Sequence, residues 1–219
     1  MRDTERIIRA AFGGKAFDDI FEEFDQEPLG VGAIAQVYKA RIKPGLLPPL
    51  EPQTKKPLRQ AFREKVDGLV KSAPGQGIPS SYVAIKVIHP HVENIVNRDL
   101  KIIRFFAVLL NAVPTLEWLS FPEEVDVFSD MMRLQLDLRI EAENLAKFRS
   151  NFKGRTTVTF PRPYRDHTTR DVLIEEFAHG IPLAAFLESG GGDYQEEIAN
   201  MGLDAFLVPI ASRIPVPHC

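Results

Sequence analysis

The spacing of hydrophobic residues changes several times along the chain, and each change predicts a different element. Residues 4–12 predict a helix, because their apolar side chains recur at helical spacing on one face. A second predicted helix follows, and its apolar side chains form an aromatic stripe facing a core: Phe17, Ile20, Phe21 and Phe24. Pro28 ends this helix, since the residue before a proline disfavours the helical conformation.

The pattern then changes to alternation with a period of two, which is typical of a strand. Residues 33–42 alternate in this way, and Val37 and Tyr38 favour a strand there. Residues 83–88 predict a second, short apolar strand. Between these strands, residues 43–81 carry proline-rich flanks around a short amphipathic helix, and this composition predicts a surface insertion.

The second half of the chain contains both helical and strand patterns. The longest predicted helix covers residues 122–152, with Phe128, Ala142 and Phe148 in its apolar stripe. The other predicted elements are a helix over 94–110, strands over 156–160 and 171–177, a helix after Gly180, and a helix over 198–207. This order predicts an α+β fold in which one long helix crosses an antiparallel sheet.

Composition narrows the class of protein. A chain of 219 residues with 44% hydrophobic and 26% charged residues is long enough to bury a sizeable core. Its net charge of −3 gives no reason to expect nucleic acid as a partner. Cys219 is the only cysteine, so the chain cannot form an internal disulfide, which fits a reducing compartment. The most apolar stretch, Phe105 to Leu116, is too short to span a bilayer, so we expect no transmembrane segment.

The turn from Gly30 to Ala35 is the first candidate for ligand binding. Its sequence satisfies G-x-G-x-x-A, which alone is a weak match to dinucleotide-binding turns. Such a turn needs a strand before it and a helix after it, whereas Pro28 precedes this turn and an alternating strand follows. A strand–turn–strand hairpin over phosphates, as in kinases, fits this context better. A hairpin of small residues without a ligand is the alternative.

Lys86 is the second candidate, because it interrupts the apolar strand Val-Ala-Ile-Lys-Val. This string is typical of the lysine that pairs with phosphates in kinases. A charge in an apolar strand needs a partner, which a kinase-like site supplies from a helix packed on the sheet. The long predicted helix offers Asp137, Glu141 and Asn144 on one face. The alternatives are an edge-strand lysine and a solvated helix face.

Another motif adds one candidate nucleotide-binding segment, and the remaining motifs argue against metal, P-loop and hydrolase sites. The strand over 171–177 runs through Glu176 into a glycine-ended connector, where a kinase-like hinge would bind adenine through backbone groups. His89 and His91 lack nearby cysteines or a convergent set of carboxylates, so we expect solvent-facing loop histidines rather than metal ligands. Neither G-x-x-x-x-G-K-[ST] nor G-x-S-x-G occurs, so P-loop and α/β-hydrolase sites lack their markers.

With these segments the chain resembles the UbiB family of atypical kinases, the aarF-domain-containing kinases. The resemblance covers residues 4–207 and is carried by residues 24–29, 33–40 and 83–90, the helix of Asp137, Glu141 and Asn144, and the hinge-like strand. It implies a protein-kinase-like N-lobe, with an antiparallel sheet and a long αC-like helix, and the start of an incomplete helical C-lobe. The implied segments are a helical lead-in 1–28, an N-lobe 29–177 with the insertion 43–81, and a hinge with truncated C-lobe start 178–219.

The resemblance also implies a nucleotide site for ATP or ADP with magnesium. In it the Gly30–Ala35 turn fills the family's nucleotide loop, Lys86 meets the phosphates and Glu141 holds Lys86. The family's Glu-x-Asp element falls on residues 135–137, where Gln135 replaces the first acid. The implied nucleotide-binding residues are Gly30, Gly32, Ala33, Ala35, Lys86, Gln135, Asp137, Glu141 and Glu176.

The family implies a mitochondrial ATPase or unorthodox kinase with lipid or coenzyme Q pathway partners. The sequence contains neither the family's Lys-x-Gly-Gln segment nor its catalytic loop and metal-binding Asp-Phe-Gly. Three prolines in the divergent tail 208–219 contradict continuation of the preceding helix. We therefore expect a truncated lobe without catalytic or metal-binding residues that binds nucleotide at most weakly and without phosphoryl transfer. The alternatives are a non-catalytic interaction module, using residues 43–81 or an exposed face, and a non-functional truncated product.

Overall fold

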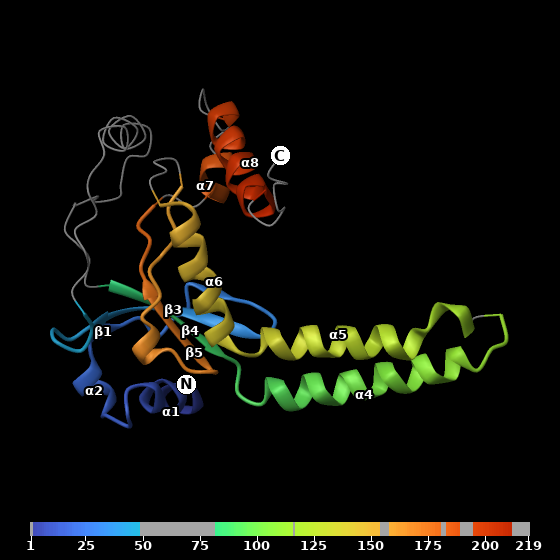
Figure 1. The fold of residues 1–219 in the computed structure, drawn as a ribbon. Helices are drawn as coiled ribbons and strands as arrows, with labels where there is room; N and C mark the ends of the chain where they lie inside the picture. Colours follow the sequence, from blue (N-terminus) through green and yellow to red (C-terminus); the bar gives the residue numbers. More distant parts are fainter. Residues whose placement is uncertain are drawn as a thin grey trace. The chain divides into compact units, whose positions relative to one another are not determined.

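The computed structural model of the chain describes residues 2–48, 82–115, 117–153, 158–180, 183–188 and 195–211 (Figure 1). The chain forms two compact units, and each is described by itself. The first unit contains the sheet and consists of Met1–Pro48, Ser81–Asn144 and Pro163–Glu176. The second consists of Pro49–Ser80, Leu145–Arg162 and Phe177–Cys219. The three segments implied by the family resemblance stay predictions, because these units follow contacts rather than chain order.

A five-stranded antiparallel sheet forms the centre of the first unit. Its strands are β1 (Phe21–Phe24), β2 (Gly30–Val31), β3 (Ala35–Ile42), β4 (Tyr82–Ile88) and β5 (Val172–Glu176). They follow the order β1-β3-β4-β5, and β2 also pairs with β3. The alternating and apolar patterns predicted β3 and β4 to within two residues. This sheet and the helices around it confirm the predicted α+β class.

One face of the sheet is sealed. Side chains alternate between the two faces of each strand, and on this face Tyr38, Ile85 and Ile174 are at most 3% exposed. The helix α1 (Arg2–Ala11) covers this face, and the Gln36 amide donates a 3.3 Å hydrogen bond to its Thr4 hydroxyl. Burial of one large apolar side chain contributes about 1.5–3 kcal/mol, so this face supplies much of the unit's stability.

The opposite face of the sheet is partly open. It carries Lys39 of β3, Lys86 of β4 and Glu175 of β5, all of intermediate exposure. The helix α6 (Leu138–Asn151) reaches this face at Glu141, whose carboxylate contacts Lys86. Figure 1 shows α1 and the start of α6 on opposite sides of the sheet. A ligand of this unit would therefore meet the open face rather than the sealed one.

Two antiparallel helices leave the sheet unit as a hairpin. They are α4 (Val92–Asn111) and α5 (Phe121–Gln135), and the short 3-10 helix η1 (Glu117–Leu119) lies between them. An ion pair of 2.8 Å between Arg104 Nε and Asp126 Oδ1 joins the two helices. Figure 1 shows the hairpin extending away from the sheet. Among the described residues, no helix is both long and apolar enough to cross a membrane.

The prediction of a second helix from Phe17 to Phe24 is wrong in its second half. The helix α2 ends at Ile20, and residues 21–24 form β1, which pairs with β3. The aromatic residues do reach the core, since the rings of Phe24 and Tyr38 lie 5.2 Å apart between centroids. The free edge of β3 supplies backbone partners for this segment, and that long-range pairing overrides the helical spacing.

The longest predicted helix is interrupted. It divides into α5 and α6, and Leu136 and Asp137 lie between them. The Leu138 amide donates to the Arg170 carbonyl at 2.9 Å, and the Asp137 carboxylate accepts from the Arg139 amide at 3.0 Å. A side-chain cap and a long-range backbone bond thus replace two helical bonds, which starts a new helix at Leu138.

Three further predictions concern the last third of the chain and can be compared with the structure. Residues 158–160, the described part of the strand predicted over 156–160, are not a strand, since Pro161 and Pro163 lack amide donors. The predicted helices after Gly180 and over 198–207 correspond to α7 (Leu183–Glu188) and α8 (Gln195–Ala211). Because α8 continues through Pro209, the prediction that prolines end it at Leu207 is wrong. Most of the insertion 43–81, from residue 49 onwards, lies outside the described residues, as does the tail after Ala211.

Candidate functional site

A row of paired residues runs across the sheet from the glycine turn to Lys86. Gly30 lies opposite Val37, Val37 lies opposite Lys86, and Lys86 lies opposite Leu173. Directly opposed residues of antiparallel strands project from the same face, so Gly30 and Lys86 share the open face. Neighbouring strands are about 4.8 Å apart, which separates Gly30 from Lys86 by about 10 Å. The turn and the lysine thus border the same surface.

Lys86 is held by Glu141. Its ammonium lies 2.9 Å from Oε1 and 2.8 Å from Oε2 of the Glu141 carboxylate. The Lys86 side chain is 28% exposed and that of Glu141 is 41% exposed, so the pair is open to a ligand. An ammonium has three donors, and Glu141 engages two of them at most. The predicted pairing of this strand lysine with a helix carboxylate is therefore present in the structure.

The turn before β3 is small and fixed at its tip. The Gly32 amide donates to the Ala35 carbonyl at 2.8 Å, which closes the turn. Neither Gly30 nor Gly32 has a left-handed backbone, and a β-carbon at Gly30 would meet no other atom within 4 Å. The glycines are therefore not required by the backbone; they leave space above the sheet. Gly30, Gly32 and Ala33 are exposed, whereas Ala35 is buried at the start of β3.

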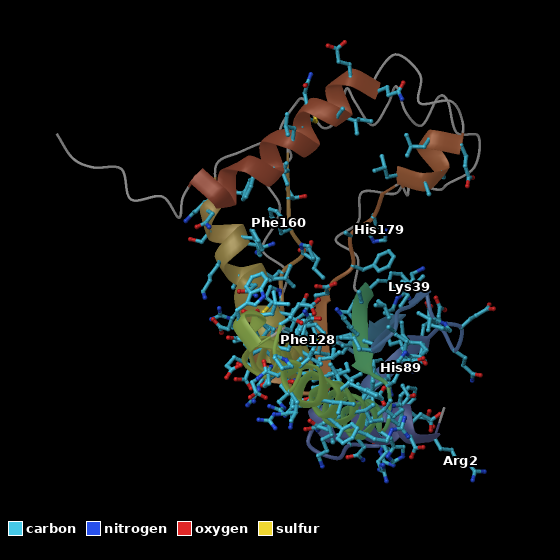
Figure 2. All side chains as sticks on the ribbon, turned by 90° about the vertical axis from the view of Figure 1, so that its right-hand side faces the viewer. Arg2, Lys39, His89, Phe128, Phe160 and His179 are labelled. Carbon is cyan, nitrogen blue, oxygen red and sulfur yellow. The ribbon has the colours of Figure 1, made fainter. Side chains whose placement is uncertain are left out.

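His89 anchors this turn through contacts that the sequence prediction of a solvent-facing loop histidine did not include. Its ring Nε2 lies 2.9 Å from the Gly32 carbonyl oxygen, and its backbone amide donates to the Ile34 carbonyl at 2.9 Å. Its exposure is intermediate. Figure 2 shows His89 and Lys39 beside the strand β4. Nothing in the local pattern distinguishes His89 from a surface histidine, because both contacts come from a turn more than fifty residues earlier in the chain.

Glu175 is a site residue that the sequence analysis missed. It lies opposite Ala84 in the β4–β5 pair, one row from Lys86 and on the same face. Burial and, to a smaller extent, the charge of Glu141 raise the pKa of its carboxyl to about 7, against the opposing charge of Lys86. The period of two indicates only that Glu175 shares a face with Leu173, and the register of β5 against β4 makes this the face of Lys86.

The residues of the predicted Glu-x-Asp element do not join this cluster. Gln135 is exposed at the end of α5. Asp137 instead turns to Arg139, whose guanidinium lies 2.6 Å away and lowers the pKa of the Asp137 carboxyl. Because Asp137 precedes α6, the prediction that it shares one helix face with Glu141 and Asn144 is wrong. No contact with Lys86 supports the predicted contribution of Gln135 and Asp137 to nucleotide binding.

Glu176 ends β5 on the other face. It lies opposite Val83, whose side chain is 2% exposed and belongs to the sealed face. The Glu176 side chain therefore projects away from Lys86, and only its backbone groups are placed to reach a ligand on the open face. This agrees with the predicted hinge, which would use backbone groups, but it leaves the carboxylate without a direct part in the site.

Comparison with known proteins gives one consistent family. Residues 1–46 and 76–214 match the ABC1 atypical kinase-like domain. The chain is 42% identical over 203 residues to a mitochondrial ABC1 family protein of Schizosaccharomyces pombe, covering 92% of this chain and 28% of that protein. It is 39% identical over 194 residues to another of Saccharomyces cerevisiae, covering 87% and 26%. It therefore spans little more than a quarter of the length of these relatives.

More distant similarities agree with this result. A probable protein kinase UbiB of Tolumonas auensis is 25% identical over 199 residues, covering 90% of this chain and 30% of the relative. The solved complex of Rv3197 and erythromycin from Mycobacterium tuberculosis superposes with a TM-score of 0.56 at 20% identity, covering 85% of this chain and 38% of that one. The structural likeness supports the fold alone. The family match and the sequence relatives together establish that the chain belongs to the ABC1 atypical kinase-like family, which includes the UbiB proteins.

Proposed function

We propose that the sheet unit binds the phosphates of a nucleotide, ATP or ADP with magnesium, through Lys86. The observation that carries this proposal is the ion pair of Lys86 with Glu141 on the open face, in the row that starts at Gly30. A lysine held by a helix carboxylate beneath a small-residue turn is the arrangement that kinases use for nucleotide phosphates. Membership in a kinase-like family supports the same ligand.

Each residue of the site has a distinct part in this proposal. Lys86 supplies a positive charge and at least one donor to a phosphate oxygen, while Glu141 fixes where the ammonium lies. The turn from Gly30 to Ala33 covers the phosphates, because its two glycines are exposed and carry no side chains. His89 holds the turn in place through the Gly32 carbonyl.

The residues of this site fit the phosphates better than they fit the metal ion. Lys86 supplies hydrogen-bond donors, and the described residues contain no cluster of three His, Cys, Asp or Glu side chains around a common point. Magnesium in nucleotide sites is often bound by phosphate oxygens together with one or two carboxylates. We therefore propose that magnesium accompanies the nucleotide. Its charge would neutralise phosphate oxygens that Lys86 does not reach.

We propose that this chain alone binds nucleotide without transferring a phosphoryl group. The family's catalytic loop and Asp-Phe-Gly do not occur among its 219 residues, so no residue is assigned to hold the metal or activate an acceptor. For the protein in its cell we propose a mitochondrial location and a part in coenzyme Q or lipid metabolism. The mitochondrial names of two relatives support the location, and the UbiB relatives support the pathway.

Titration of the chain with ATP, with heat or fluorescence as the readout, tests the proposed function, and Gly30→Ala is the most informative variant. A methyl group at Gly30 meets no protein atom within 4 Å, so thermal stability should hold or rise slightly. It occupies the open face in the row of Lys86, so ATP affinity should fall several-fold. Gly202→Ala, on α8, is the matched control, since a β-carbon there also meets nothing within 4 Å. Equal ATP affinity in wild type and Gly30→Ala would count against a turn that covers the phosphates.

A second candidate function, a non-catalytic interaction module, is favoured by the hairpin of α4 and α5. Apolar side chains stand out from both helices and from η1 between them: Phe105 is 66% exposed, Trp118 is 78% exposed and Val127 is 58% exposed. Figure 2 includes the side chains along the hairpin and labels Phe128 among them. Exposed apolar surface on this scale is typical of interaction sites. A chain that serves only as such a module would give no saturable signal in the ATP titration.

A further inference from the structure

Three ionisable side chains meet on the open face, and the proposed phosphate site uses only two of them. Glu175 lies opposite Ala84, and Lys86 is two residues after Ala84 on the same strand. Ala84 ends at its β-carbon, and the Glu175 carboxyl is close enough to Lys86 and Glu141 for both charges to shift its pKa. Glu141 reaches the same ammonium from α6. Lys86 thus faces two carboxyl groups.

In the part of the chain that the structure describes, each cation near Glu175 has another contact. From α6, Glu141 repels it, and from β4, Lys86 attracts it but is bonded to both oxygens of Glu141. From β3, Lys39 lies in the same row, with its ammonium 4.5 Å from the centre of the Tyr82 ring. After the bridge partner Pro163, Arg165 pairs with Glu143 at 3.2 Å. No hydrogen bond to the Glu175 carboxyl comes from the described residues.

We propose that Glu175 is a specificity-determining residue of the phosphate site, because its protonation decides whether the site accepts an anionic ligand. Its carboxyl must carry a proton when an anionic phosphate occupies the open face. This inference rests on the proposed function. The neutral acid leaves Lys86 as a net attractive group for phosphate, whereas the ionised acid adds a second negative charge beside it. Binding of nucleotide is therefore coupled to uptake of a proton by the Glu175 carboxyl.

The direction of the coupling follows from electrostatics. Burial and the charge of Glu141 already hold the pKa of Glu175 at about 7. A bound phosphate adds negative charge nearby and engages Lys86, and both effects favour the protonated acid further. At pH 6 the proton is present before binding, whereas at pH 8 it must be taken from solvent. Because the pKa of Glu175 is about 7 before the nucleotide binds, the affinity for the nucleotide should fall about tenfold between pH 6 and pH 8.

The matched variant is Glu175→Gln, which keeps the size of the side chain and stays neutral at every pH. ATP changes its own protonation near neutral pH, so the readout is the ratio of the affinities of variant and wild type for the same ATP solution. The titrations use the full chain, and a second pair of buffers with different ionisation enthalpies measures proton uptake. Glu124→Gln, an exposed change on α5, controls for loss of one negative charge.

We expect Glu175→Gln to bind ATP about as tightly as wild type at pH 6 and about tenfold more tightly at pH 8. Proton uptake beyond that of ATP itself should be present in wild type and in Glu124→Gln, and absent in Glu175→Gln. A ratio that is the same at both pH values would overturn the inference while leaving the proposed function intact. Absence of ATP binding by wild type at both pH values would instead remove the proposed function, and this inference with it.

Discussion

Replacing Lys86 by alanine is expected to lower the affinity of the chain for ATP by about tenfold to a hundredfold. A hydrogen bond to a charged group contributes about 1.5–3 kcal/mol, and a factor of ten in affinity corresponds to about 1.4 kcal/mol. Lys86 is the cation that Glu141 positions on the open face, and the variant leaves Glu141 and Glu175 there as uncompensated acids. The loss of attraction by Lys86 and the added repulsion by these acids both lower the affinity for phosphate.

The titration of Lys86→Ala is best made at pH 6, where protonation of Glu175 limits repulsion within the empty site. Lys101→Ala is the matched control, because Lys101 is exposed on α4 and its loss changes the net charge equally. The same samples report on catalysis. We expect phosphate release from ATP at the same background rate in wild type and Lys86→Ala. Equal ATP affinity in these two proteins would contradict the assignment of Lys86, and faster release by wild type would contradict the absence of phosphoryl transfer.

Glu175→Gln is expected to raise the free energy of unfolding at pH 8 by up to about 3 kcal/mol. The pKa of Glu175 is raised from 4.5 to about 7 in the folded chain, so the native state binds the proton more tightly than the unfolded state. Wild type therefore loses stability as the pH rises from about 4.5 through about 7, and each unit of this interval corresponds to about 1.4 kcal/mol. Glutamine does not ionise, so the variant avoids this loss.

Urea unfolding at pH 5 and pH 8 measures this difference. The gain in Glu175→Gln should be small at pH 5, where the wild-type acid is still protonated in the folded chain, and largest at pH 8. Exposed Glu124→Gln should change the free energy of unfolding by less than about 0.5 kcal/mol at both pH values. A loss of stability at pH 8 would mean that the ionised carboxylate has a favourable partner, which contradicts the charge arrangement described above.

The central strands and the ion pair were predictable because their signals are local. Alternation over residues 35–42 and an apolar run over 82–88 fix which side chains share a face, and Lys86 stands out as a charge within the run. Physical chemistry then demands a partner for that charge. Glu141 was among three polar residues at helical spacing, and only the structure selects it, by placing its carboxylate 2.8 Å from the ammonium.

The errors arose where long-range pairing decides the conformation. Residues 21–24 carry helical spacing but join the edge of β3, which lies more than ten residues later. The break before α6 depends on the Arg170 carbonyl, which accepts from Leu138 across about thirty residues of sequence. Asp137 could have been recognised as a cap, since aspartate is favoured at the position just before a helix begins.

The two site residues that the sequence did not reveal, His89 and Glu175, also depend on long-range pairing. His89 contacts the Gly32 carbonyl only because β3 and β4 bring the turn beside the end of β4. Glu175 lies in the strand predicted over 171–177, one position before Glu176, the residue that the hinge prediction names. The register of β5 against β4 places Glu175, not Glu176, on the face of Lys86. A one-residue shift in register would reverse this assignment, and the sequence does not contain the register.

Labelling of the full chain with an acyl phosphate derivative of ATP tests the central claim most directly, since this reagent acylates a lysine beside the nucleotide phosphates. We predict that peptide mass spectrometry finds the acyl group on Lys86 and that excess ATP prevents the labelling. Lys39 lies one row away on the same face and is the internal control, which should stay unlabelled. Acylation of Lys39 in place of Lys86, or labelling of Lys86 that excess ATP does not prevent, would contradict the assignment of the phosphate site.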